Sequence, residues 1–571
     1  FISMINLLIV FLSFLNPIDS FLSRGESTDS NMVVFLENYQ VDKNDLNRFH
    51  NLVFSDFYLE RFESFQQEWH QKMNSIDFDS LDRAGKVDFI LLKNYIQHEL
   101  DVVKFKKEEN KQMKDFFIFI DDILYLEENR RLMLEVDPKE SAEILMRVQE
   151  AIESKKEELK GLDPSAIDAV FANESSKKLN QLNGVLSTWF NYYHNFDPEF
   201  DWWVEEQYRK TNQALEDFSS WLRVEIAGQR GNDDDPIIGT PIGREKLLSE
   251  LSYEMIAYSP EEILEIAESE FKWCEDQMDK ASEEIGFKNR NDALEHVKDL
   301  YVDPGKQDDL VNAQMNESLD FLKNRDLVTI PALAEEFWRL EMINARSQRY
   351  FPFAYYSGQS MGVAFATSEM DHSSKLQSMR GNNMHFSRNV TPHELIPGHH
   401  LQSFIASRNN THRRMFYTPF YVEGWALYWE FRYFDLGWGN SPEDEIGMLF
   451  WRMHRAARII TTIKYHLNQM TANEMVDFLV DRVGHERDNA VSEVRRYIDG
   501  SYGPLYQSGY MLGGIQIREL HKELVVNGTM TERDFHDNVL VVNSIPIEMV
   551  RMLLTKLEIK SDYKPVWRFY D

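Results

Sequence analysis

Apolar residues return every three or four positions over most of this sequence, which is the spacing of an α-helix. Residues 87–103 and 142–162 show this spacing most directly, and Asp163 and Pro164 end the second segment. The chain has only 25 Gly and 17 Pro in 571 residues, whereas Leu, Glu, Lys, Met and aromatic residues recur at helical spacing. We therefore expect a mainly α fold with few strands.

The chain also exceeds the size at which one hydrophobic core usually divides, so we expect two lobes with a central cleft. Turn residues cluster at positions 228–243, and this break separates an N-terminal helical lobe, residues 21–235, from a second lobe, residues 236–571. The same cluster is equally compatible with a mobile loop at the cleft. In the second lobe, Ser259 is a typical helix N-cap, and short strands are expected within residues 353–367.

A chemical motif lies in the second lobe, between His393 and His400. One large class of zinc hydrolases places two histidines at i and i+4 of a helix, with a glutamate beside the first. Here Glu394 follows His393, but the next histidines, His399 and His400, come at i+6 and i+7. A regular helix turns residue i+6 well away and sets residue i+7 about 10 Å along the axis, so neither spacing suits one metal in an unbroken helix.

Pro397 offers a way to bring two of these histidines together. A proline inside a helix lacks the backbone N–H and presses on the carbonyl four residues earlier, which here belongs to His393. We expect a π-type bulge, with Gly398 supplying a permissive backbone, that returns His399 to the side of His393. His393 and His399 are thus the predicted metal ligands, with His400 as the alternative to His399.

A catalytic zinc site needs a third protein ligand as well as an open position. Glu423 is the best candidate, because it lies 24 residues beyond His399 and begins an aromatic-rich helical segment. Glu394 is then expected to be the general base. Taken alone, Glu423, Leu427 and Glu430 are also compatible with one face of an amphipathic helix. The order and separation of the two motifs together favour a metal site.

Several blocks of the sequence resemble the domain of unknown function 885 family, which is placed among metallopeptidase-like proteins of the gluzincin type. The blocks are residues 391–402, 421–428, 493–497, 510–513 and 535–547, within a likeness that spans roughly residues 240–555. The resemblance also supports His399 as a ligand, because helical gluzincins often have a glycine directly before the second histidine. It further implies that a short strand beside the metal helix pairs with an extended substrate.

The chain departs from many family members at two places. Residues 462–466 read Thr-Ile-Lys-Tyr-His where relatives carry Asp-Thr-Gly-Ile-His, and Met511 stands where relatives have lysine, but His466 and Tyr510 are retained. Because peptide hydrolysis creates an oxyanion, we expect Tyr510, and after it His466, to assist the metal, although packing roles would also explain both. The planar guanidinium of Arg496 suits a substrate carboxylate. A surface salt bridge is the default role of such an arginine.

Charge and cysteine content narrow the class of partner. The formal charge of −33, from 62 basic and 95 acidic residues, argues against nucleic acid, because phosphate binding needs concentrated positive charge. The acidity is compatible with basic peptides, but solubility of a secreted protein is the simpler reason. Cys274 is the only cysteine, so the chain forms no intramolecular disulfide and offers no cysteine-rich zinc site.

The first residues indicate export. Residues 5–15 are apolar except for Asn6 and Ser13, which is too short for a membrane span and typical of a signal peptide. We expect residues 1–20 to be a signal peptide and the protein to be periplasmic or extracellular, or anchored to a membrane through this segment. No later segment is long and apolar enough to suggest another span.

Together these patterns predict a zinc-dependent metallopeptidase, with a peptide or small protein as substrate and Zn²⁺ as cofactor. Two alternatives remain open at this stage. One is a catalytically inactive helical protein that binds a metal or a peptide, and the other is a zinc hydrolase of a different amide or ester. The sequence does not decide between cleavage inside a peptide and cleavage at its end, nor does it predict the oligomeric state.

Overall fold

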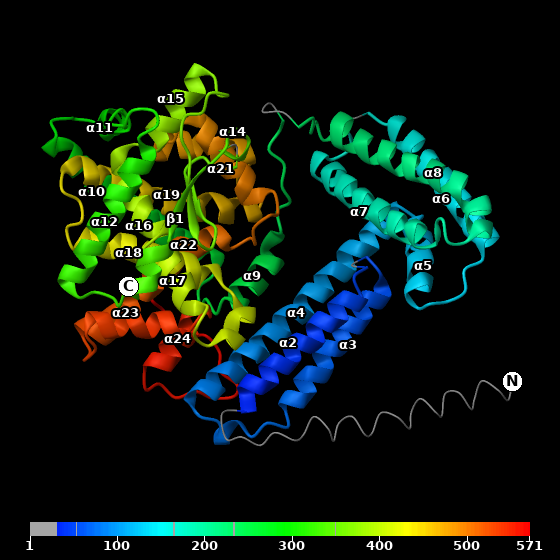
Figure 1. The fold of residues 1–571 in the computed structure, drawn as a ribbon, viewed down its shortest axis with the longest axis horizontal. Coiled ribbons are helices and arrows are strands. Elements are labelled where there is room, and N and C mark those ends of the chain that lie inside the picture. The colour runs from blue at the N-terminus through cyan, green and yellow to red at the C-terminus, as the bar shows by residue number, and fades with distance from the viewer. Residues whose placement is uncertain (1–30, 53, 164–165, 232–234, 349, 571) are drawn as a thin grey trace.

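The computed structural model describes residues 31–52, 54–163, 166–231, 235–348 and 350–570 and is mainly α-helical, as predicted (Figure 1). The signal peptide predicted for residues 1–20 lies outside these residues. The helices of the first half are α2 (Asn31–Phe49), α3 (Asp56–Met73), α4 (Arg83–Phe116), α5 (Ile120–Arg131), α6 (Pro138–Lys160), α7 (Ala169–Tyr193), α8 (Pro198–Trp221), α9 (Gly243–Tyr253), α10 (Pro260–Glu284), α11 (Arg290–Lys298), α12 (Gln307–Arg325) and α13 (Ala332–Phe337).

The second half holds the remaining helices and a small sheet. Its helices are α14 (Ala345–Gln348), α15 (His372–Gly381), α16 (Met384–Glu394), α17 (His399–Ala406), α18 (Pro419–Asp435), α19 (Pro442–His466), α20 (Ala472–Phe478), α21 (Arg487–Ile498), α22 (Tyr506–His521), α23 (Glu532–Val541) and α24 (Ile547–Leu554). Short 3-10 or π segments are η1 (Phe78–Ser80), η3 (Leu222–Ile226), η4 (Thr411–Phe416), η5 (Leu479–Val483) and η6 (Lys522–Val526). Among the described helices, none combines the length and apolarity that a membrane-spanning segment needs.

Local sequence accounts for the helices that were predicted individually. The segments 87–103 and 142–162 lie almost entirely in α4 and α6, where their regularly spaced apolar residues are buried. Helix α10 begins as predicted, with Ser259 as its N-cap. The Ser259 side chain accepts from the backbone N–H of Glu262, whose own side chain bonds back to Ser259, so both partners satisfy donors that a helix end leaves free.

Two main cores organise the molecule. The smaller core lies among α5–α8, which Figure 1 shows grouped at one side of the molecule. The larger core joins residues of α2, α3 and α4 to those of the helices from α9 onward. The predicted lobe boundary at residues 235–236 falls in the non-helical segment between η3 and α9, but the packing assigns much of α2–α4 to the larger core. The predicted central cleft remains a prediction.

The sheet is small and lies against α16, the helix that carries His393 and Glu394. Its strands are β1 (Arg339–Met342), β2 (Ala354–Tyr356) and β3 (Ser360–Val363), in the order β1-β3-β2. Strand β3 is parallel to β1 and antiparallel to β2. Two of the three strands fall within the predicted segment 353–367, and β2 contacts α16.

Close helix packing sets the position of α18. Glycines face each other where α18 and α22 cross, because a side chain at Gly424 would lie 2.6 Å from the backbone of Gly513. The two helices therefore approach backbone to backbone, which places the start of α22 beside the start of α18. Helix α19, buried along nearly its whole length, packs against both α16 and α22. These contacts frame the motif at the end of α16.

Candidate metal centre

Helix α16 carries the first part of the motif in spite of a proline within it. The side chain of Asn383 caps its start by accepting from the backbone N–H groups of His385 and Phe386. Pro392 cannot donate to the carbonyl of Arg388. That carbonyl instead accepts from the indole Nε1 of Trp438 at 3.2 Å, so the helix continues to Glu394 without an unpaired backbone oxygen.

The predicted bulge within a single helix is wrong, because the chain breaks into two helices. Helix α16 ends before a turn at residues 395–398, in which the peptide bond preceding Pro397 is cis, and α17 begins at His399. Pro397 has no N–H to continue the helical ladder, so the helix stops before it. The backbone N–H of Gly398 then donates to the carbonyl of Pro392 at 3.0 Å, which folds the turn back onto α16.

Gly398 makes this close return possible. A Cβ atom at position 398 would lie 1.7 Å from the carbonyl oxygen of His393 and 2.6 Å from that of Pro392. Only a residue without a side chain fits between the turn and the end of α16. The return places the imidazole of His399 beside that of His393, with ring centres 4.9 Å apart and ring planes nearly perpendicular.

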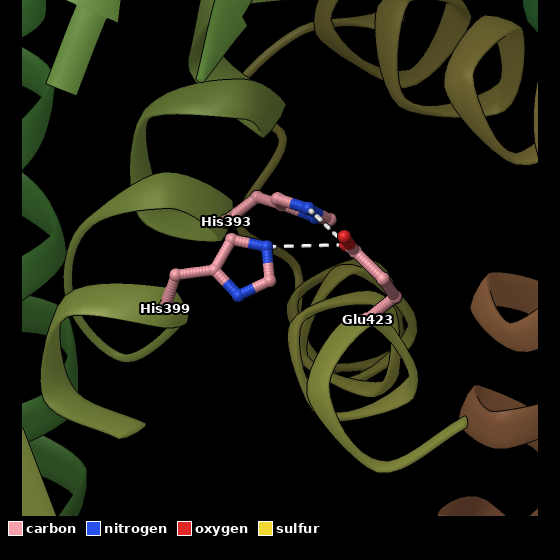
Figure 2. Close-up of side chains that lie close together, drawn as sticks. All are labelled: His393, His399 and Glu423. Atoms are coloured by element: carbon pink, nitrogen blue, oxygen red, sulfur yellow. Dashed lines mark hydrogen bonds and ion pairs between the residues drawn. The ribbon is translucent and has the colours of Figure 1, made fainter. Parts of the chain in front are cut away.

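Glu423, in the second turn of α18, meets both histidines (Figure 2). Its Oε2 lies 3.1 Å from Nε2 of His399 and 3.7 Å from Nε2 of His393, and all three side chains are buried. Ligands at about 2.1 Å from a tetrahedral zinc lie about 3.4 Å from one another. The separations of 3.1 and 3.7 Å lie on either side of that value, so two imidazoles and one carboxylate form a donor set that fits zinc.

A second carboxylate orients His393. Glu430 lies two helical turns after Glu423 on the same face of α18, and its Oε1 is 2.6 Å from Nδ1 of His393. The same carboxylate accepts from Asn389 at 2.7 Å and lies 3.4 Å from Arg455. A carboxylate on one imidazole nitrogen holds the ring so that its other nitrogen is available to a metal. The spacing of Glu430 from Glu423 was visible in the sequence, but its partner across the fold was not.

Burial and charge act against each other at these residues. Burial disfavours the charged form of His393, but hydrogen bonds to Glu423 and Glu430 outweigh it and raise its pKa to about 9. Burial also works against the charged form of Glu423, yet the charge of His399 and hydrogen bonds from both histidines hold its pKa well below the usual range. For Glu430, Arg455 and His393 likewise overcome burial and lower the pKa.

Two tyrosines of α22 complete the surroundings. The hydroxyl of Tyr506 donates to Oε1 of Glu423, the oxygen that does not face the histidines. The ring of Tyr510 lies nearly parallel to that of His393, with ring centres 6.2 Å apart. Burial, followed by the charge of Glu423, raises the pKa of both hydroxyls, so both keep their protons. Tyr510 was predicted near the metal site, whereas Tyr506 was not singled out.

The other predicted residues have different surroundings. Glu394 is half-buried at the end of α16, directly after His393. His400 turns away from the donor set, since its Nε2 bonds to the carbonyl of Ala334 at 2.8 Å and its Nδ1 to the hydroxyl of Tyr356 at 3.1 Å. Burial alone lowers the pKa of His466 to about 4, and neither ring nitrogen has a partner among the described residues. The structure does not bring His400 or His466 to Glu423.

The fold and the site thus define a mainly helical protein with a buried donor set of two histidines and one glutamate. Residues 46–554 match the family model described as "Bacterial protein of unknown function (DUF885)", and the chain belongs to that family. A comparison with curated proteins found no match.

Solved structures share the fold over nearly the whole chain. One is described as "a putative lipoprotein of unknown function from Shewanella oneidensis", at 15% identity and a TM-score of 0.65, with 92% of this chain and 99% of that chain covered. Another is "the putative lipoprotein from Colwellia psychrerythraea", at 17% identity and a TM-score of 0.57, covering 92% of this chain and 98% of that one. At these identities the likeness establishes the fold alone.

Proposed function

We propose that this protein is a zinc-dependent metallopeptidase of gluzincin type that hydrolyses peptide bonds. The observation that carries the proposal is the meeting of His393, His399 and Glu423 in one buried cluster, in which one ligand atom from each side chain lies within 4.8 Å of the others. Two histidines and a glutamate are the donor set of several zinc peptidases. A zinc ion bound here would supply a Lewis acid that activates water and polarises the scissile carbonyl.

The surrounding residues have separate roles in this proposal. Glu430 holds Nδ1 of His393 and thereby directs Nε2 toward the cluster. Glu394 is half-buried and directly follows His393 at the end of α16, and in this proposal it takes a proton from the attacking water and passes it to the leaving amine. The Tyr510 hydroxyl, which burial keeps protonated, would donate to the oxyanion.

A Glu394→Gln variant tests this assignment directly. We expect it to bind zinc at the wild-type stoichiometry, because Glu394 is not among the three donors, and to lose cleavage of a mixed peptide library. Wild-type cleavage should also stop on addition of a chelator and return with zinc. Glu205→Gln is the matched control, since Glu205 is exposed on α8. Full cleavage by the Glu394→Gln variant would contradict the mechanism, and zinc binding without wild-type cleavage would favour a binding protein instead.

We also propose that the protein is exported. Residues 5–15 have the composition of a signal segment, and two proteins with the same fold are described as lipoproteins. Fractionation of cells that express the full chain should place it outside the cytoplasm or with the membrane. Recovery of the whole protein in the cytoplasmic fraction would contradict this.

A further inference from the structure

Three arginines gather around Tyr510 in an otherwise strongly acidic protein. Arg455 and Arg458 of α19 lie over the Tyr510 ring, with their guanidinium carbons 4.6 and 4.5 Å from its centre. Arg496 of α21 adds a third positive charge that also acts on Tyr510. Since the formal charge of the chain is −33, such a concentration of buried cations beside the proposed metal site needs a reason.

The protein's own carboxylates do not use all the donors of this cluster. Glu493, fully buried, accepts from Arg458 at 2.8 Å, Arg496 at 2.5 Å and the hydroxyl of Tyr497 at 2.6 Å. Glu430 is the other carboxylate, and it is shared with His393. Three arginines therefore face two carboxylates.

Several N–H groups of the cluster remain without an acceptor among the described residues. They are Nε of Arg455, Nη1 of Arg458 and Nε of Arg496. A buried charged donor that lacks an acceptor is costly, so such groups in a folded protein call for a partner. A planar guanidinium is well matched to a carboxylate, to which it donates two parallel hydrogen bonds.

Arg496 is the most exposed arginine of the cluster. Its side chain is 15% exposed, against 3% for Arg458. Its guanidinium lies 5.9 Å from the ring of Tyr502, which is 4.3 Å from the ring of Tyr506. The hydroxyl of Tyr506 in turn donates to Glu423. A short row of tyrosines thus links the arginine to the proposed metal ligand.

We propose that Arg496, backed by the charge of Arg458, binds a carboxylate of the substrate, so that the site selects peptides with a negative charge close to the bond that is cleaved. This inference rests on the proposed function. The carboxylate has two possible sources, the C-terminus of the peptide or an Asp or Glu side chain. In the first case the protein removes residues from C-terminal ends, and in the second it cleaves next to acidic residues.

The test uses binding, so that it does not depend on turnover. Full-length Glu394→Gln protein with zinc is dialysed against three hexapeptide libraries, and bound peptides are quantified by mass spectrometry. The first library has free C-terminal carboxylates, the second has C-terminal amides and no acidic residues, and the third has amides with Asp or Glu at fixed positions. Loss of charge-assisted hydrogen bonds should weaken binding of the uncharged library about 10- to 100-fold relative to the library that supplies the carboxylate.

Substitution of Arg496 then tests whether this residue causes the preference for peptides that carry a carboxylate. We expect Arg496→Ala to remove the discrimination between the charged and uncharged libraries, whereas Arg496→Lys should retain part of it. Glu493 keeps Arg458 and Tyr497 as partners in both variants, and thermal unfolding checks that they fold. Arg487→Ala, an exposed position on the same helix, is the matched control.

The outcomes separate this inference from the proposed function. Equal binding of all three libraries, no binding of any, or full discrimination in Arg496→Ala overturns the carboxylate site. Chelator-sensitive cleavage of all three libraries by the wild type at equal rates would uphold the peptidase and reject the carboxylate site. Discrimination that depends on Arg496 without any cleavage by the wild type would uphold the carboxylate site and reject the peptidase.

Discussion

Replacing Gly398 by alanine tests how the turn between α16 and α17 builds the donor set. The added Cβ would lie 1.7 Å from the carbonyl oxygen of His393, and real Cβ atoms essentially never approach closer than 3.0 Å. The turn must therefore move by at least about 1.3 Å away from the end of α16. Because His399 directly follows Gly398, its imidazole moves with the turn, whereas metal ligands tolerate only about 0.2 Å of error.

The expected loss follows from the number of ligands. Structural zinc sites contribute roughly 10–16 kcal/mol, which is about 3 kcal/mol for each of four ligands. Misplacing His399 should therefore raise the zinc dissociation constant by about 100-fold. Overpacking should also lower the stability of the metal-free protein by about 1–3 kcal/mol.

The assay is competition for zinc against a chromogenic chelator, with urea unfolding of the metal-free protein beside it. Gly184→Ala is the matched control, because a Cβ at this exposed helical position meets no atom within 4 Å. There we expect unchanged zinc affinity and slightly higher stability, by up to about 1 kcal/mol. Wild-type zinc affinity in Gly398→Ala would refute the argument that this turn positions His399.

Three further predictions concern the neighbouring residues. His400→Ala should keep its zinc but lose about 2–4 kcal/mol of stability, since a buried ring is removed; loss of zinc would make His400 a ligand. Glu430→Gln should weaken zinc binding by about 10- to 100-fold in the same chelator competition, because His393 loses its orienting charge, and unchanged affinity would exclude that role. Burial lowers the folded-state pKa of His466 from 6.5 to about 4, so only the unfolded chain takes up its proton between these values. The free energy of unfolding should therefore fall by up to about 3 kcal/mol as pH drops from 6.5 to 4. In urea titrations at both pH values, His466→Leu should lack this decrease. The same decrease in the variant as in the wild type would contradict the pKa shift.

The sequence predicted the local elements well where helical spacing and end signals agree. The segment that became α10 had a typical N-cap at Ser259, and the structure confirms it. The backbone of the segment from His393 to His400 was harder to predict, because Pro397 indicates that the helix is interrupted but not how. A bulge and a complete break both satisfy a proline, and the choice depends on whether a neighbouring element accepts the new direction of the chain. Here the chain breaks between α16 and α17, and Gly398 passes so close to His393 that only a residue without a Cβ fits there.

Strand β1 and the roles of Glu430 and Tyr506 were not predicted, for a related reason. Residues 339–342 are short and mostly exposed, so their pairing with β3 leaves no regular pattern in the sequence. In the sequence, nothing distinguishes Glu430 and Tyr506 from other helical residues. Their roles arise only when α16 and α22 pack beside α18. Their partners, His393 and Glu423, are far away in the chain, and local spacing contains no information about such contacts.

By itself, the sequence determined the helical class of the protein, the choice of His393 and Glu423 as candidate donors and the glycine and proline that interrupt the motif, because periodicity, residue chemistry and backbone constraints are local properties. Only the tertiary structure decided that His399 rather than His400 joins His393, and that Arg496 lies among the cations around Tyr510. These outcomes depend on how α16, α18, α19, α21 and α22 pack, and packing is settled by the whole set of buried surfaces at once.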